Sequence, residues 1–190
     1  MHLLRHLRPD LVRLELDSAV TPPDVAEYES ARAHAQEWGR EPPPRPDFDR
    51  PDEHTRRARK DAVVSELAAL LDSSGEVRNL SKLTRDLMDR ESQSTTAVGG
   101  GLAIPHVRSL QPRRLVVCMA RTRRGAEYLA EDGAPVHVFV CIASPSYDDA
   151  DYWKLYRWAA NVFFQEGWLV NAILDAADEH EILRLMKSLR

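Results

Sequence analysis

The chain has 190 residues, 43% of them hydrophobic and 29% charged, with a formal net charge of -4. This length and composition fit one well-buried globular domain with an extension and are too small for two ordinary domains. The acidic balance argues against a nucleic-acid binder, and no apolar run is long enough to insert into a membrane. Since the start also lacks the apolar core of a signal peptide, we expect a cytoplasmic protein.

The first 57 residues predict short elements and then a helix with a proline-rich return. Residues 3–7 fit one helical turn, and residues 11–16 alternate like a half-buried strand. Thr21 and the two prolines after it form a helix-start signal, and an apolar stripe follows as far as Trp38. Five prolines in residues 42–51 then predict an extended linker. Whether the helix packs on its own domain or on another protein stays open.

The rest of the chain predicts helices around two central strands. Apolar, β-branched runs at 115–120 and 136–143 indicate strands that are covered on both faces, with a hairpin or loop over 125–135. Cys118 and Cys141 lie inside these runs, so we expect buried thiols rather than a disulfide or a metal site. Helical periodicity predicts helices over 57–71, 80–89, 151–164, 169–176 and 179–189.

Three consecutive glycines, Gly99, Gly100 and Gly101, precede a short apolar run that ends at Pro105 and His106. Proline cannot donate to a sheet ladder, so we expect the strand to fray at Pro105 and to present His106 at the surface. A turn of free amides beside a neutral imidazole suits a phosphoryl group. The same residues also fit a glycine turn before a strand that ends in a polar side chain.

The residues around this turn follow the order of a known family. They are Arg90, Glu91, Thr96, Gly99, Gly101, Ala103, Ile104, Pro105 and His106, followed by residues 125–128, 132–133 and 135–136. This pattern resembles the enzyme IIA domain, fructose/mannitol type, of the bacterial sugar phosphotransferase system, a family that includes a nitrogen-regulatory branch. The resemblance covers residues 58–190 and, more weakly, the start, so it implies one IIA domain formed by 1–17 and 58–190. Residues 18–57 are then an insertion that the family lacks.

The resemblance implies a single α/β domain whose mixed β-sheet is flanked by helices on both faces. It also implies that His106 accepts a phosphoryl group from the phosphocarrier HPr or a paralogue and passes it to an enzyme IIB domain. No metal or cofactor takes part. Arg90, the Thr96 hydroxyl and the amides of Gly99, Gly100 and Gly101 are expected to cradle the phosphate. Without that role, Arg90 is a cation at a helix C-terminus and Thr96 is a turn residue.

One departure from the family lies 46 residues beyond His106, where many members have a second histidine and this chain has Tyr152. A phenol donates a hydrogen bond but does not titrate near neutral pH, and Tyr152 fits a packing role equally well. A regulatory IIA-like protein, controlling a transporter or kinase by protein binding with no sugar phosphorylation, therefore stays open. We expect the insertion to set the partner or the oligomeric state, for example as a homodimer through residues 18–57.

The residues disfavour two other functions. A hydrolase that used His106 as base would need a serine or cysteine nucleophile and an acid in matching positions, and the sequence offers no such set. No Gly-Lys-Ser/Thr motif follows the glycines, which argues against nucleotide binding.

Overall fold

Two long apolar runs form the centre of a mixed sheet. In the computed structural model, which describes residues 7–147 and 149–189, β5 (Val116–Ala126) and β6 (Val136–Pro145) pair in antiparallel fashion. Burial of successive residues on both strands confirms that they are central strands covered on both faces. Both strands continue beyond the predicted ends.

Four short strands complete the six-stranded sheet, whose order is β1-β5-β6-β3-β2, with β4 also paired to β6. β1 (Val12–Arg13) runs parallel to β5, and β2 (Ala97–Gly99) runs antiparallel to β3 (Leu102–Ala103). β3 and β4 (His106–Ser109) both run parallel to β6, one after the other along the same edge.

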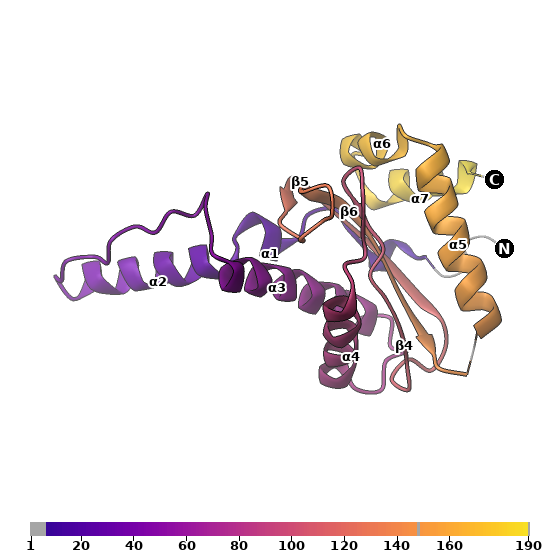
Figure 1. Ribbon diagram of the computed structural model, residues 1–190, viewed down its shortest axis with the longest axis horizontal. Coiled ribbons are helices and arrows are strands. Elements are labelled where there is room, and N and C mark those ends of the chain that lie inside the picture. Colours follow the sequence, from indigo (N-terminus) through magenta and orange to yellow (C-terminus); the bar gives the residue numbers. More distant parts are fainter. Residues whose placement is uncertain (1–6, 148, 190) are drawn as a thin grey trace.

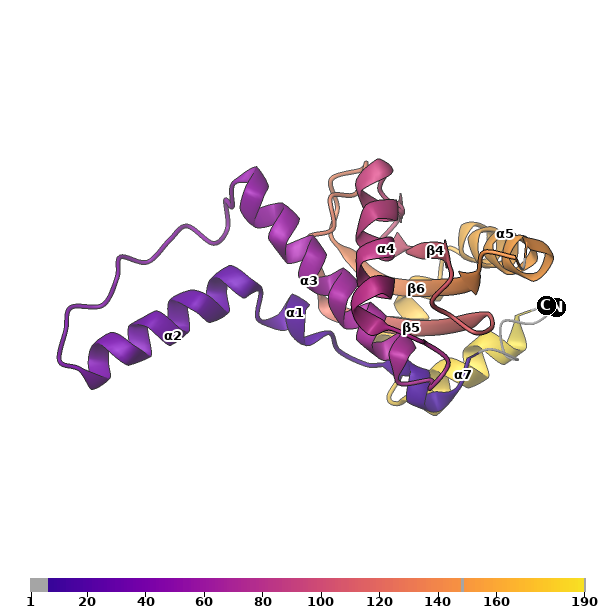
Figure 2. The same ribbon diagram turned by 90° about the horizontal axis from the view of Figure 1, so that it is seen from below.

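Helices cover both faces of this sheet (Figures 1 and 2). α3 (Glu53–Asp72) and α4 (Leu80–Gln93) lie on one side, and α5 (Asp149–Gln165), α6 (Leu169–Asp175) and α7 (Glu179–Ser188) lie on the other. The predicted α/β architecture, a mixed sheet between two helical layers, is therefore confirmed.

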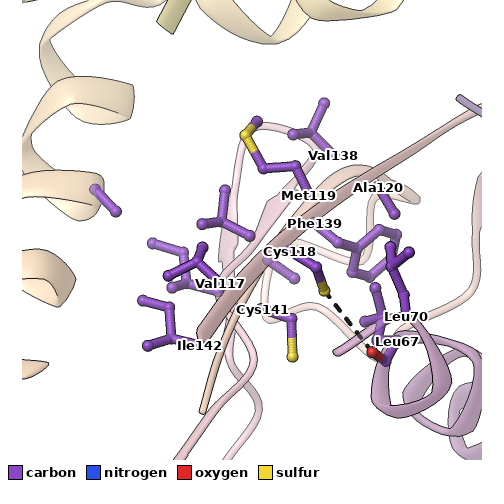
Figure 3. Close-up of a cluster of buried hydrophobic side chains, with 14 of the residues drawn as sticks. Leu67, Leu70, Val117, Cys118, Met119, Ala120, Val138, Phe139, Cys141 and Ile142 are labelled. Atoms are coloured by element: carbon purple, nitrogen blue, oxygen red, sulfur yellow. Dashed lines mark hydrogen bonds between the residues drawn. The ribbon is translucent and has the colours of Figure 1, made fainter. Parts of the chain in front are cut away.

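The two cysteines lie in the core between α3 and the central strand pair, as Figure 3 shows. Cys118 and Cys141 face each other across β5 and β6, and both are free and buried as predicted. The Cys118 thiol donates to the Leu67 carbonyl of α3 at 3.7 Å. Burial raises the pKa of this thiol, so it stays protonated and acts as a small apolar side chain.

The N-terminal strand is shorter than its alternating pattern predicts. A 3₁₀ turn occupies Pro9–Leu11, only Val12–Arg13 pair with β5, and α1 (Asp17–Val20) begins soon afterwards. The carboxylate of Glu66 on α3 accepts from the backbone amides of Asp17 and Ser18 at 3.0 and 2.9 Å, which starts this helix. Most of the turn expected over 3–7 lies outside the described residues.

α2 (Pro23–Glu37) and the proline-rich return after it form an arm, residues 22–52, which projects away from the sheet (Figures 1 and 2). No residue of α2 is fully buried, and Trp38 at its far end is 64% exposed. Tyr28 and Phe48 join the two legs of the arm edge to face at 5.5 Å. The helix packs on its own return segment and adds nothing to the domain core.

α3 begins at Glu53, four residues before the predicted start. The Asp52 carboxylate accepts from the Thr55 amide at 2.7 Å, which is an N-cap bond that satisfies a free donor of the first turn. At the base of the arm, the Arg59 guanidinium on α3 binds both carboxylate oxygens of Asp24, at 2.9 and 2.7 Å. The arm is therefore fastened to the domain at its base.

Candidate functional site

His106 is the first residue of β4 and pairs with Ile142 of β6. The strand does not end at this histidine, as the proline had suggested, because β4 resumes the edge that β3 leaves at Ala103. The side chain is also not presented at the surface, since the residue is only 7% exposed. His106 is thus held by the sheet and largely shielded from water.

Two hydrogen bonds fix the tautomer of the His106 ring. Nδ1 lies 2.7 Å from the carbonyl oxygen of Ile104, and Nε2 lies 3.0 Å from Nη2 of Arg90. A carbonyl can only accept and a guanidinium can only donate. Nδ1 therefore carries the proton, and the Nε2 lone pair points at Arg90.

The surroundings keep this ring uncharged. Burial lowers the pKa of His106, the hydrogen bond to Ile104 opposes that shift, and the positive charge of Arg90 adds to it. An ordinary histidine has a pKa of about 6.5, so a lowered value leaves the imidazole neutral at pH 7. A neutral ring whose Nε2 carries a lone pair rather than a proton is the nucleophilic form, and here that lone pair accepts from Arg90.

Arg90 reaches the ring from the last turn of α4, which runs past the predicted end to Gln93. Its Nη1 donates to the Ser94 carbonyl at 3.1 Å, while Nη2 contacts His106. The planar guanidinium is thereby oriented by its own helix end.

A cavity of about 520 Å³ opens beside His106. Its lining comes from α4, β4 and the start of α5. The lining residues are Asp86, Asp89, Arg90, Gln93, His106, Val107, Arg108, Tyr152 and Trp153. The site thus has a nucleophilic nitrogen, two guanidinium groups and a phenol around one space, which is an arrangement that can receive a small anionic group.

Residues 54–189 match the model of the family described as phosphoenolpyruvate-dependent sugar phosphotransferase system, EIIA 2. The chain belongs to this family. The resemblance noted in the sequence is thereby confirmed, and the enzyme IIA match begins near the start of α3, just after the arm.

Two of the curated relatives of this enzyme IIA chain are fructose-type components. It is 32% identical over 85 residues to the fructose-specific EIIABC component of Bacillus subtilis, a match that covers 45% of this chain and 13% of that protein. It is 27% identical over 94 residues to the fructose-like EIIA component of Escherichia coli, covering 50% of this chain and 64% of that one. The chain spans less than two thirds of either relative.

Solved structures show the same fold. The nitrogen regulatory protein IIA-Ntr from Neisseria meningitidis superposes with a TM-score of 0.69 at 16% identity, over 97% of this chain and 98% of that chain. The mannitol enzyme IIA in its complex with phosphorylated enzyme IIB from Escherichia coli gives 0.58 at 15% identity, over 68% and 88% of the two chains.

Tyr152 of this enzyme IIA lies beside the histidine. It is 3% exposed, and the two ring centroids are 6.1 Å apart. Burial raises the pKa of Tyr152 to about 12, so the phenol remains a protonated donor at every physiological pH.

The structure does not bring the glycine turn to His106, which corrects the expected cradle. Leu102, just after the turn, pairs with Val138, whereas His106 pairs with Ile142. Four residues of a strand span about 13 Å, so the turn lies at the other end of this edge. All three glycines have positive φ, and Gly100 donates its amide to Asp132 at 3.1 Å.

Thr96 also points elsewhere. It is buried, and its hydroxyl donates to Oε2 of Glu91 at 2.6 Å while its amide donates to Oε1 at 2.8 Å. The expected role as a phosphate donor is not supported by this arrangement, because the hydroxyl proton is already committed to a carboxylate.

Sequence reasoning missed two residues of the site, Tyr156 and Arg108. The Tyr156 ring meets His106 edge to face at 4.6 Å, closer than Tyr152 does. Its signal was helical spacing, since Tyr156 follows Tyr152 by one turn of α5. Arg108 lines the cavity two residues after His106, and strand alternation returns position i+2 to the same face.

Proposed function

We propose that this enzyme IIA chain is a phosphocarrier in which His106 accepts a phosphoryl group from phospho-HPr or a paralogue and passes it to an enzyme IIB component. The observation that carries the proposal is the unprotonated Nε2 of His106, 3.0 Å from the Arg90 guanidinium and beside an open cavity. Family membership supports the reaction class, and the solved complex of mannitol IIA with phosphorylated IIB supports the second partner.

In the proposed step, the Nε2 lone pair of His106 attacks phosphorus on the donor phosphohistidine. The new N–P bond forms as the P–N bond to the donor imidazole breaks, and the bonding pair leaves with the donor nitrogen. No base is needed, because Nε2 carries no proton to remove, and the Arg90 N–H that Nε2 accepts turns to the oxygens of the incoming phosphoryl group. Nδ1 keeps its proton on the Ile104 carbonyl.

The phosphoryl group adds roughly -1.5 to -2 charges, which need donors within reach. Arg90 already lies against Nε2, so its guanidinium meets oxygens attached there, and the Tyr152 phenol supplies a second donor. The lining holds two aspartates, Asp86 and Asp89, beside its two arginines. This balance suits a group that is held briefly and then passed on.

Incubation with labelled phosphoenolpyruvate, enzyme I and HPr tests the assignment. We expect acid-labile label on the wild type and on the His180→Gln control, which changes an exposed histidine of α7, and none on His106→Gln. Label that persists in the His106 variant would refute the assignment.

A regulatory role is the second candidate, and Tyr152 in place of the second histidine is the observation that favours it. A regulator takes the group from HPr but controls a transporter or kinase through protein contact alone. Adding a purified enzyme IIB to the labelled protein separates the two: loss of label from His106 with gain on IIB marks a carrier, and label that stays on His106 marks a regulator.

A further inference from the structure

The carboxylate of Glu91, next to Arg90 on α4, is buried and fully engaged. Oε1 lies 2.9 Å from Lys60 Nζ on α3 and accepts from the Thr96 amide at 2.8 Å. Oε2 accepts from the Thr96 hydroxyl at 2.6 Å. The Lys60 ammonium also lies 4.8 Å from the ring centroid of Tyr128. One carboxylate thus joins α3, the end of α4 and the segment that enters β2.

Stability alone does not account for this cluster. Taking an ammonium and a carboxylate out of water costs free energy that the ion pair recovers only with good geometry and further hydrogen bonds, and apolar replacements are often as stable. Both Lys60 and Glu91 are under 10% exposed. Apolar contacts are not directional. The hydrogen bonds of the charged groups are, so they fix the rotation of the last turn of α4 and its position along the helix axis.

That rotation decides where Arg90 points. Consecutive residues on a helix point about 100° apart, so fixing Glu91 toward α3 and the core fixes Arg90 toward β4. The same turn is closed from both sides, because Arg90 binds the Ser94 carbonyl at 3.1 Å and Glu91 binds the Thr96 amide. In both views α3 and α4 lie together on one side of the sheet, with the end of α4 near β4 (Figures 1 and 2).

We propose that Lys60, Glu91 and Thr96 form a strap that holds the end of α4 so that the Arg90 guanidinium lies on Nε2 of His106. Glu91 is then a positioning residue for phosphoryl acceptance. The role of Glu91 in phosphoryl acceptance rests on the proposed function, while the claim that the strap places Arg90 on Nε2 is independent of it. The cavity lining around His106 includes none of the three, so the strap acts by placing Arg90, beside the charge of Glu91, which raises the pKa of His106.

The first test is a double-mutant comparison of phosphorylation rates. Glu91→Gln keeps the size of the side chain but removes the ion pair with Lys60, and it should slow labelling on the order of tenfold, since small misplacements of a catalytic group are costly. In an Arg90→Ala background the same change should have no further effect. A further loss there would overturn the proposal, because Glu91 would then act by another route.

Glu66→Gln is the matched control. Like Glu91, Glu66 accepts hydrogen bonds from the backbone and from a hydroxyl. It lies on α3, its donors are the amides of Asp17 and Ser18 and the Ser18 hydroxyl, at 3.0, 2.9 and 2.6 Å, and it holds α1. We expect it to lower the melting temperature without slowing labelling. At position 96, Thr96→Ser should keep the rate and Thr96→Val should lower it. If Glu66→Gln slowed labelling as much as Glu91→Gln does, with the two variants equally stable, the strap would have only a general structural role.

An NMR measurement tests the strap even if the proposed function is wrong. In the wild type, the ¹⁵N shift of His106 Nε2 should report an acceptor bonded to Arg90, and this signature should be lost in Glu91→Gln and kept in Glu66→Gln. If the wild type takes no label, the phosphocarrier proposal falls while the strap is decided by this spectrum. A signature that persists in Glu91→Gln overturns the strap.

Discussion

At the residue scale, the chemistry of His106 follows from which groups surround each ring nitrogen. The Ile104 carbonyl holds the proton on Nδ1, and the Arg90 guanidinium faces the lone pair on Nε2. Burial disfavours the charged ring, and the neighbouring guanidinium disfavours it further. In the proposed transfer, the arginine that meets the phosphoryl group thus also keeps the imidazole nucleophilic beforehand.

The pH dependence of the His106 ring tests this pairing. With its pKa lowered by burial, the ring should stay neutral somewhat below pH 6.5, and acceptance should decline only as pH falls through the lowered pKa. Arg90→Met removes a charge that depresses this pKa, so the midpoint should rise. NMR titration of the ring measures the midpoint in the wild type and in Arg90→Met. Arg184→Met on α7 is a control that should leave the midpoint unchanged. A midpoint that stays or falls in Arg90→Met would contradict the pairing.

The lowered pKa of His106 also makes the stability of the fold depend on pH, in one direction. A histidine whose pKa is lower in the folded state favours the unfolded chain once the medium becomes acidic. The free energy of unfolding should therefore be undiminished by His106 above about pH 6.5 and should fall as pH drops from there through the lowered pKa.

A substitution at Tyr152 distinguishes a phenol that takes part in phosphoryl transfer from a ring that only packs. Tyr152→Phe keeps the ring contacts with His106 but removes the donor, so phosphorylation should slow by roughly tenfold, the worth of one hydrogen bond to a charged group. A packing role predicts an unchanged rate. Labelling kinetics and the melting temperature, measured together, distinguish the two, and Tyr156→Phe shows whether loss of a hydroxyl on the same helix has the same effect.

At the scale of elements, the local sequence predicted most of the helices and the central strands, because each of these patterns involves residues that are close together in the chain. Central strands, helices and the free thiols could all be read from apolar runs and helical periodicity. The Asp52 cap that moves the start of α3 is also local and was readable from its spacing to Thr55.

What the sequence could not show depends on pairing between distant segments. The glycine turn appeared to adjoin His106 because only four residues separate Gly101 from it, Leu102 to Pro105, but an extended edge along β6 keeps them apart. The burial of His106 comes from rings on α5, far along the chain. Thr96 was assigned to the phosphate by the family resemblance, and its bond to Glu91 could not be read from the sequence because it depends on how the chain folds after α4.

At the scale of the whole molecule, the arm lies far from β4 and α5, two of the elements that line the His106 cavity (Figures 1 and 2). The arm extends beyond the start of α3, and the cavity lies among α4, β4 and α5. A protein bound along the arm would therefore leave His106 open to its own partners. Among residues 7–147 and 149–189, no helix has the length and apolarity needed to cross a bilayer.

Removing the arm tests its separation from the phosphotransfer domain. Replacing residues 22–51 by a linker of roughly six glycine and serine residues keeps α1 on Glu66 and the Asp52 cap of α3. Because α2 has no buried residue, we expect cooperative unfolding, a melting temperature within a few degrees of the wild type and unchanged labelling of His106. Loss of cooperative unfolding would show instead that the arm belongs to the core.

The same deletion decides whether the arm mediates self-association. No residue of α2 is buried and Trp38 at its end is 64% exposed, so the arm leaves apolar surface that a second copy of the chain can cover. We therefore propose a homodimer through the arm, with light-scattering masses of a dimer for the full chain and a monomer for the deletion and for Trp38→Asp. A monomeric full chain at high concentration would contradict this and leave the arm for a different protein.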